Sequence, residues 1–164
     1  MKNPLFFIAL VLIAACASYG QSRSSSVHQS RVALADQAWQ PFFADFRTAV
    51  NKRDRVALRE MMATDFFYTI GHHASDQREA AFAYWDEQKG SGWKAFSRVL
   101  AKGAVRTSDK SLSNSGEVEG PMRVAPPAAG RRNSFRRNLI HWYAVFEFRS
   151  DGRWYCITFI ECCD

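Results

Sequence analysis

Two runs of β-branched and aromatic residues, LIHWYAVFEF at 139–148 and WYCITFI at 154–160, flank the short polar segment RSDGR at 149–153. Residues of these types favour strands, and an Asp-Gly pair supplies the positive φ angles that a tight hairpin turn requires. The stretch therefore predicts a long β-hairpin within residues 138–163. The rest of the chain is organised around it.

The pairing of the two strands follows from the turn. With a two-residue loop of Asp151 and Gly152, Phe148 pairs with Tyr155 and the count runs outward from there. One face then carries apolar and aromatic residues: Phe148, Phe146, Ala144, Tyr155, Ile157 and Phe159. The other face mixes polar and apolar residues: His141, Tyr143, Val145, Glu147, Cys156, Thr158, Ile160 and Cys162. We expect the first face to be core and the second to form a pocket wall.

Helical periodicity dominates the residues before the hairpin. Apolar residues recur at helical spacing from Trp39 to Val50, which predicts a helix that ends at Asn51 and begins at Asp36 or Gln40. Such an aromatic stripe is typical of a helix packed on a core.

Four further elements follow before residue 103. Asp54 can cap a second, shorter helix, and residues 65–70 have strand composition. Asp76 and Glu79 form a capping box for a helix over residues 76–88. Apolar spacing predicts another helix over residues 93–102, and residues 104–107 predict a short strand.

Residues 108–137 show no sustained pattern, and their prolines indicate irregular chain. Between residues 120 and 146 there are five arginines and no acid: Arg123, Arg131, Arg132, Arg136 and Arg137. The segment is either a solvated loop or a patch for an anionic ligand or an acidic membrane surface. It lacks interleaved aromatic and basic residues, so we expect no nucleic-acid binding.

The N-terminus predicts export. Lys2 precedes an unbroken apolar run over residues 5–15, which is typical of a secretory signal peptide and too short to span a bilayer. We expect residues 1–20 to be this signal and the mature protein to be periplasmic. Two processing sites are possible: cleavage before Ser18, or a lipoprotein signal in which Cys16 is lipidated. If Cys16 is lipidated, the protein contacts the membrane only through its lipid anchor.

Residues 21–37, with five serines and no apolar period, predict a flexible tether, which leaves residues 38–164 as the folded domain. Cys156 and Cys162 are separated by about 20 Å of strand, beyond disulfide reach. The cysteines and His141 lack the spacing of a metal site. We therefore expect no disulfide framework, no metal and no cofactor.

The order of these elements, helices first and antiparallel strands last, defines an α+β domain. WQPFF at 39–43, DFFY at 65–68, AVFEF at 144–148 and TFI at 158–160 resemble the nuclear-transport-factor-2-like superfamily, in particular its bacterial SnoaL-like members. The resemblance covers residues 38–164. It implies a cone-shaped curved antiparallel sheet packed against three or four N-terminal helices, a pocket inside the cone, and a homodimer through the outer sheet face.

Polar and aromatic side chains near that pocket are the site candidates. We expect the ligand to be bound by five of them: Tyr68, Trp85, Arg136, His141 and Tyr143. The candidates for acid-base chemistry are His141, Tyr143, Tyr68 and Asp65. Each of these residues can instead have a purely structural role, as a buried side chain with a satisfied polar tip or as a cap.

Two functions remain open. The first is an exported, non-catalytic domain that binds a small ligand or serves as an accessory module. The second is a SnoaL-like lyase or isomerase. Isomerases of this superfamily use an aspartate base and a tyrosine donor. No aspartate of this sequence matches the position of that base. The only clear acid on the pocket wall of the hairpin is Glu147, which is near the turn. We favour the binding module, since fold alone does not define function.

Overall fold

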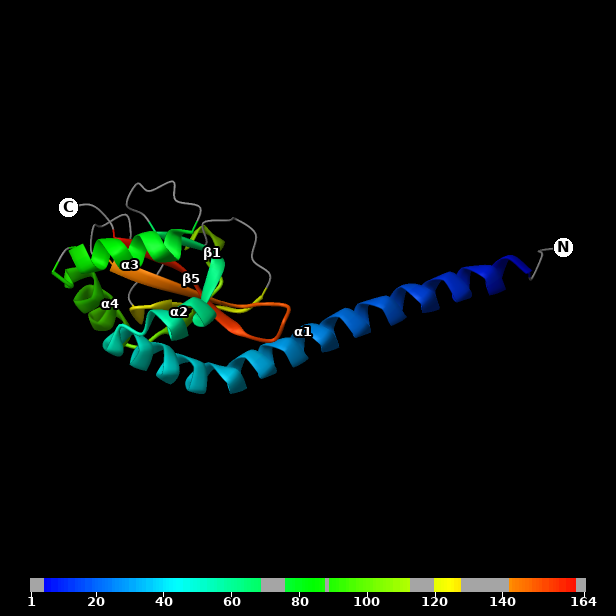
Figure 1. Ribbon diagram of the computed structural model, residues 1–164. Helices are drawn as coiled ribbons and strands as arrows, with labels where there is room; N and C mark the ends of the chain where they lie inside the picture. The colour runs from blue at the N-terminus through cyan, green and yellow to red at the C-terminus, as the bar shows by residue number, and fades with distance from the viewer. Residues whose placement is uncertain (1–4, 69–75, 88, 113–119, 128–141, 162–164) are drawn as a thin grey trace. The chain divides into compact units, whose positions relative to one another are not determined.

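The computed structural model describes residues 5–68, 76–87, 89–112, 120–127 and 142–161 (Figure 1). The chain forms two compact units, Met1–Leu34 and Ala35–Asp164, and the core and sheet described below belong to the second. No helix in the described part of the chain has the length and hydropathy that a bilayer crossing requires.

Helix α1 (Leu5–Lys52) ends one residue beyond the predicted end. The start predicted at Asp36 or Gln40 is wrong, because the helix is continuous through both positions. The reason is that the prediction followed the apolar stripe that begins at Trp39, whereas the backbone of a helix can continue beyond the residues that carry such a stripe. The division into signal peptide, tether and domain stays a prediction.

The next two helices begin where the capping residues predicted. Asp54 precedes α2 (Arg55–Met61), and its Oδ1 accepts a hydrogen bond from the backbone N–H of Ala57 at 3.0 Å. Asp76 precedes α3 (Gln77–Glu87) and accepts from the N–H of Arg78 at 2.9 Å. Both carboxylates satisfy N–H groups that the first helical turn leaves free.

Helix α4 (Ser91–Ala101) packs against α3 through a glycine. A Cβ on Gly92 would lie 2.1 Å from Cδ1 of Trp85, so only glycine lets the helices approach this closely. The predicted stop is confirmed: Ala101 is the last residue of the helix, Lys102 is its C-cap, and Gly103 follows with a φ of 78°.

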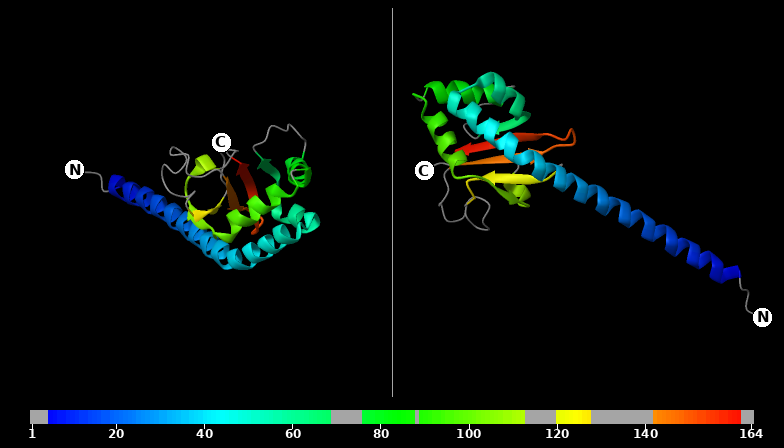
Figure 2. Two further views of the ribbon diagram at one scale, coloured as in Figure 1. Left: turned by 90° about the vertical axis from the view of Figure 1, so that its left-hand side faces the viewer. Right: turned by 90° about the horizontal axis from the view of Figure 1, so that it is seen from below.

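The fold is α+β, with four helices and a five-stranded mixed sheet in the described residues; the sheet is not closed into a barrel (Figures 1 and 2). The strand order is β1 (Met62–Tyr68), β5 (Trp154–Glu161), β4 (Trp142–Phe148), β3 (Met122–Ala125) and β2 (Val105–Thr107). The predicted all-antiparallel sheet is wrong at one edge, where β1 runs parallel to β5. The helices between β1 and β2 carry the chain to the far edge, and an antiparallel meander then returns it to β1.

The hairpin of β4 and β5 is confirmed in the described residues, but its predicted register holds only away from the turn. Ala144 pairs with Phe159 as predicted, whereas Phe148 pairs with Trp154 rather than Tyr155. The register shifts between these two pairs, opposite Val145 and Phe146. The shift places one extra residue in β5, as a β-bulge does.

The register shift also changes which side chains share a face. Cys156 lies in the cluster of Phe146 and Phe159, although the two-residue turn placed it opposite them. Ile157 lies in the cluster of Tyr143 and Val145 instead of the predicted first face. The side-chain period of a strand is two residues, so one extra residue reverses the faces of its neighbours near the turn.

Strand β3 and the 3₁₀ turn η1 (Lys110–Leu112) fall in the segment predicted to be irregular. Pro121 and Pro126 flank β3 closely, and its four residues are too few to show a strand pattern by themselves. The strand exists because β2 and β4 pair with it on either side. Pairing between segments that are distant in the sequence cannot be predicted from local composition.

The core has two parts, one on each face of the sheet. The helices of the domain lie along one face of the sheet (Figure 2). The first part of the core joins side chains of these helices and of the sheet, and its large buried side chains include Trp39, Phe46, Trp85, Phe96, Phe146 and Phe159. The second consists of smaller side chains on the other face: Ala63, Leu112, Met122, Val124, Tyr143, Val145 and Ile157. The predicted pocket wall is therefore itself largely buried.

Candidate functional site

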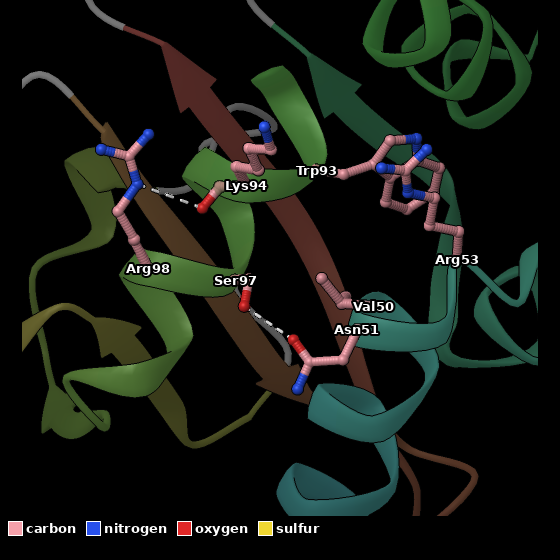
Figure 3. A pocket seen from close by; sticks show the side chains of 7 residues that line it. All are labelled: Val50, Asn51, Arg53, Trp93, Lys94, Ser97 and Arg98. Carbon is pink, nitrogen blue, oxygen red and sulfur yellow. Dashed lines mark hydrogen bonds between the residues drawn. The ribbon is translucent and has the colours of Figure 1, made fainter. Parts of the chain in front are cut away.

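A groove of about 390 Å³ lies between the C-terminal end of α1 and the outer side of α4 (Figure 3). Seven side chains line it: Val50, Asn51, Arg53, Trp93, Lys94, Ser97 and Arg98. Three of these are cations and none is an acid. Every one of the seven belongs to the second compact unit.

The end of α1 brings Arg53 to the groove. Its N–H donates to the carbonyl of Val50 at 3.1 Å, and its φ of 54° lies in the left-handed region that terminates the helix. Glycine usually occupies this position, and another residue costs about 1 kcal/mol there. A Cβ on Gly90 would lie 2.7 Å from Nη2 of Arg53, so Gly90 leaves room for the guanidinium.

The floor of the groove is apolar, and its polar atoms already have partners. Val50 and Trp93 are buried. The indole Nε1 of Trp93 donates to Oδ1 of Asp86 at 2.7 Å, and the hydroxyl of Ser97 donates to Oδ1 of Asn51 at 2.6 Å. Donation from Trp93, followed by the charge of Arg55, lowers the pKa of Asp86. That carboxylate is therefore ionised, but it faces Arg55 and does not line the groove.

The cations of the groove form no ion pair within the described residues. Arg53, Lys94 and Arg98 are exposed, and no described carboxylate lies within ion-pair distance of them, although the charge of Arg53 helps to lower the pKa of Asp86. Nε of Arg98 donates to the backbone carbonyl of Lys94 at 3.3 Å, which leaves its terminal nitrogens for other partners. Three unpaired cations around an apolar floor favour an organic anion.

A second cavity, of about 330 Å³, is lined by four arginines but differs in its electrostatics. Arg78 pairs with Asp76 at 2.7 Å, Arg149 with Asp65 at 2.7 Å, and Arg59 with Glu79. Hydrogen bonds from Arg78 and Arg59 lower the pKa values of Asp76 and Glu79. Arg59, Arg78 and Arg149 tie α2, α3, β1 and the hairpin together, and carboxylates balance their charge. The fourth arginine, Arg153, lies over the ring of Tyr155 at 5.7 Å.

The structure places Tyr68 and Trp85 together and Tyr143 apart from them. The rings of Tyr68 and Trp85 meet at a centroid distance of 5.6 Å in the first core cluster. Tyr143 is buried in the second cluster, on the opposite face of the sheet. Asp65 is exposed and bound through both oxygens by Nη2 of Arg149. Glu147 is buried, with one oxygen 3.4 Å from Nε of Arg149.

The other predicted site residues cannot be compared with the structure. His141, Arg136 and the side chain of Cys16 lie outside the described residues. Of the arginine-rich segment, Arg123 is described and lies on β3. Its guanidinium stacks on Trp39 at 4.8 Å and pairs with Asp36 at 2.9 Å, so this arginine supports the core.

None of the seven groove residues was predicted as a site residue. One signal was available in the sequence, because the segment that forms α4 contains Lys94 and Arg98 four residues apart and no acid. The contribution of α1 could not be found in this way, since it depends on two segments that meet only in the folded chain.

No family model, curated protein or solved structure matches this chain. Within the described ranges, no three histidine, cysteine or acidic side chains are grouped as a metal ion would require. Cys156 is buried, and burial raises the pKa of its thiol, so it is held as the neutral form.

Proposed function

We propose that the chain is an exported, non-catalytic binding domain of the nuclear-transport-factor-2-like type, and that it holds a small organic anion in the groove between α1 and α4. The observation that carries the proposal is the set of three unpaired cations over an apolar floor. The α+β order of helices and strands supports the superfamily, whose cone shape is part of the proposal.

We place the ligand in this groove because its described cations have no ion pair, whereas aromatic side chains pack against one another in the described core. The rings of Phe96 and Phe159 stack at 4.1 Å, and Trp85 lies 5.6 Å from Phe159. A lyase or isomerase needs an acid and a second polar group within ~3 Å of one reacting atom. Asp65 is bound by Arg149, and Tyr68 and Tyr143 occupy opposite faces, so the described candidates do not support that alternative.

The test compares an anion with its neutral analogue. Isothermal titration calorimetry measures the affinity of the purified chain for naphthalene-2-sulfonate and for naphthalene-2-sulfonamide. We expect the sulfonate to bind more tightly. The double substitution Lys94→Gln and Arg98→Gln should weaken sulfonate binding about tenfold, since each exposed charge contributes roughly 0.5–1 kcal/mol.

The matched control is Arg55→Gln with Arg59→Gln, which removes two arginines that are already paired with Asp86 and Glu79. This variant should bind the sulfonate as the unmodified chain does. Equal affinity for sulfonate and sulfonamide, or equal weakening by both double variants, would contradict the proposal.

A further inference from the structure

The cations of the groove belong to a larger basic face. On α4, Lys94 and Arg98 are four residues apart, and Lys102 follows four residues later with helical dihedrals of −78° and −3°. Positions four apart lie on one side of a helix, about 40° from each other. All three side chains are exposed, and α4 contains no acid that could pair with them.

The end of α1 extends this face. Asn51 meets Ser97 of α4 through a hydrogen bond of 2.6 Å, and Arg47 precedes Asn51 by one helical turn on the same side of α1. Asp45 lies about 200° around the helix from Arg47, so it points elsewhere. We define the basic face by five exposed residues: Arg47, Arg53, Lys94, Arg98 and Lys102. Among the described residues none of the five is ion-paired.

We infer that this basic face docks on an anionic phospholipid surface, a property beyond the binding of a small ligand in the groove. Charge complementarity carries the inference, because an extended array of unpaired cations fits an extended negative surface. Nucleic acid fits less well. Single strands bind through exposed aromatic side chains, and the aromatic residues of this part of the molecule, Phe46, Trp93 and Phe96, are buried.

The face also shows what kind of membrane contact is formed. No large apolar side chain of α4 is exposed, so the contact is electrostatic and does not insert the helix into the acyl region. Each Lys or Arg near an anionic bilayer contributes modestly, and salt screens the attraction. Docking should therefore be reversible and salt-sensitive.

The test uses the full chain with two kinds of vesicle, pure phosphatidylcholine and an equal mixture of phosphatidylcholine and phosphatidylglycerol. Co-sedimentation gives the partition coefficient on each. Binding through the apolar N-terminal residues contributes to both, so the difference between the vesicles isolates the charge-dependent part. We expect stronger partitioning onto the mixed vesicles at low salt and loss of that excess at high salt.

The variant Arg47→Gln with Lys102→Gln removes two charges of the face that do not line the groove. Its partitioning onto mixed vesicles should fall roughly 30-fold, with no change on pure phosphatidylcholine and none in naphthalene-2-sulfonate affinity. The control variant Arg55→Gln with Arg59→Gln should partition as the unmodified chain does. Equal partitioning onto both vesicles, no effect of the first variant, or tighter binding of a thymidine oligonucleotide that this variant abolishes would overturn the inference.

Discussion

Two neighbouring helical surfaces use basic residues in opposite ways. On α2, Arg55 and Arg59 pair with Asp86 and Glu79 of α3. On α4, Lys94 and Arg98 meet no carboxylate among the described residues. The difference teaches that the number of arginines and lysines does not define an anion site. What matters is whether the fold supplies acids to neutralise them.

Asp86 marks the boundary between the two surfaces. Its Oδ1 accepts from Trp93, whose ring lies in the groove floor, while its Oδ2 pairs with Arg55. This carboxylate is thus turned toward the paired surface. The orientation leaves Lys94 and Arg98 without a carboxylate partner among the described residues, whereas the charge of Arg53 still helps to lower the pKa of Asp86.

The largest expected effect comes from breaking the contact between α3 and α4. Substitution Gly92→Ala places a Cβ 2.1 Å from Cδ1 and 2.9 Å from Cβ of Trp85, close to the root of a fully buried side chain that cannot swing away. We expect the free energy of unfolding to fall by about 3 kcal/mol, as overpacking does. Urea titration followed by circular dichroism measures it.

Gly103→Ala separates this steric effect from backbone strain. Gly103 has a φ of 78°, but no atom lies within 4 Å of an added Cβ. We expect a loss of about 1 kcal/mol from the left-handed conformation alone. If both glycine variants lose the same stability, the close approach of α3 and α4 is not what positions the groove.

An intermediate effect is expected from Asp86→Ala. The variant leaves the indole N–H of buried Trp93 without its acceptor, and an unsatisfied buried donor costs about 1–3 kcal/mol. Glu79→Ala is the matched control, because it removes a carboxylate whose hydrogen-bond partner, Arg59, is exposed. Thermal unfolding should show a clearly larger loss for Asp86→Ala, and similar losses in the two variants would argue that Asp86 acts only through Arg55.

The smallest effect concerns pH. The pKa values of Asp76, Glu79 and Asp86 are lowered in the folded chain by hydrogen bonds from Arg78, Arg59 and Trp93, respectively. Their stabilisation is complete above the unfolded pKa values of about 4 and is lost as the pH falls through the lower, folded values. The free energy of unfolding should therefore decrease modestly below about pH 4.

The affinity for the sulfonate should depend on pH less than the free energy of unfolding does, because no acid lines the groove and the ligand stays ionised. Between neutral pH and pH about 5, calorimetry should show an affinity constant within a factor of about two, since no group of pKa near neutrality faces the ligand. A marked increase in affinity on acidification would mean that a carboxylate does oppose the groove cations.

Several features could be predicted because they depend on neighbouring residues. The hairpin strands follow from β-branched and aromatic composition, and Asp54 and Asp76 cap helices through N–H groups two or three residues away. The stop of α4 at Lys102 and Gly103 is equally local. In each case the energy that determines the structure comes from contacts within one turn of chain.

Other features depend on contacts between distant segments. The register shift in β5 cannot be inferred from a turn sequence, and it exchanges the faces of Cys156 and Ile157. Strand β3 forms through pairing with β2 and β4, although its composition is weak. The predicted candidates Tyr68 and Tyr143 face opposite sides of the sheet, which no local pattern revealed.

By itself, the sequence determined the α+β class, the hairpin, the helix caps and the basic character of the α4 segment, because each depends on residue types at short spacing. Only the tertiary structure decided that β1 runs parallel to β5, and that Asp86 pairs with Arg55 and does not line the groove. The physical reason is that charge compensation depends on distances between side chains from different elements. Those distances exist only once the helices have packed.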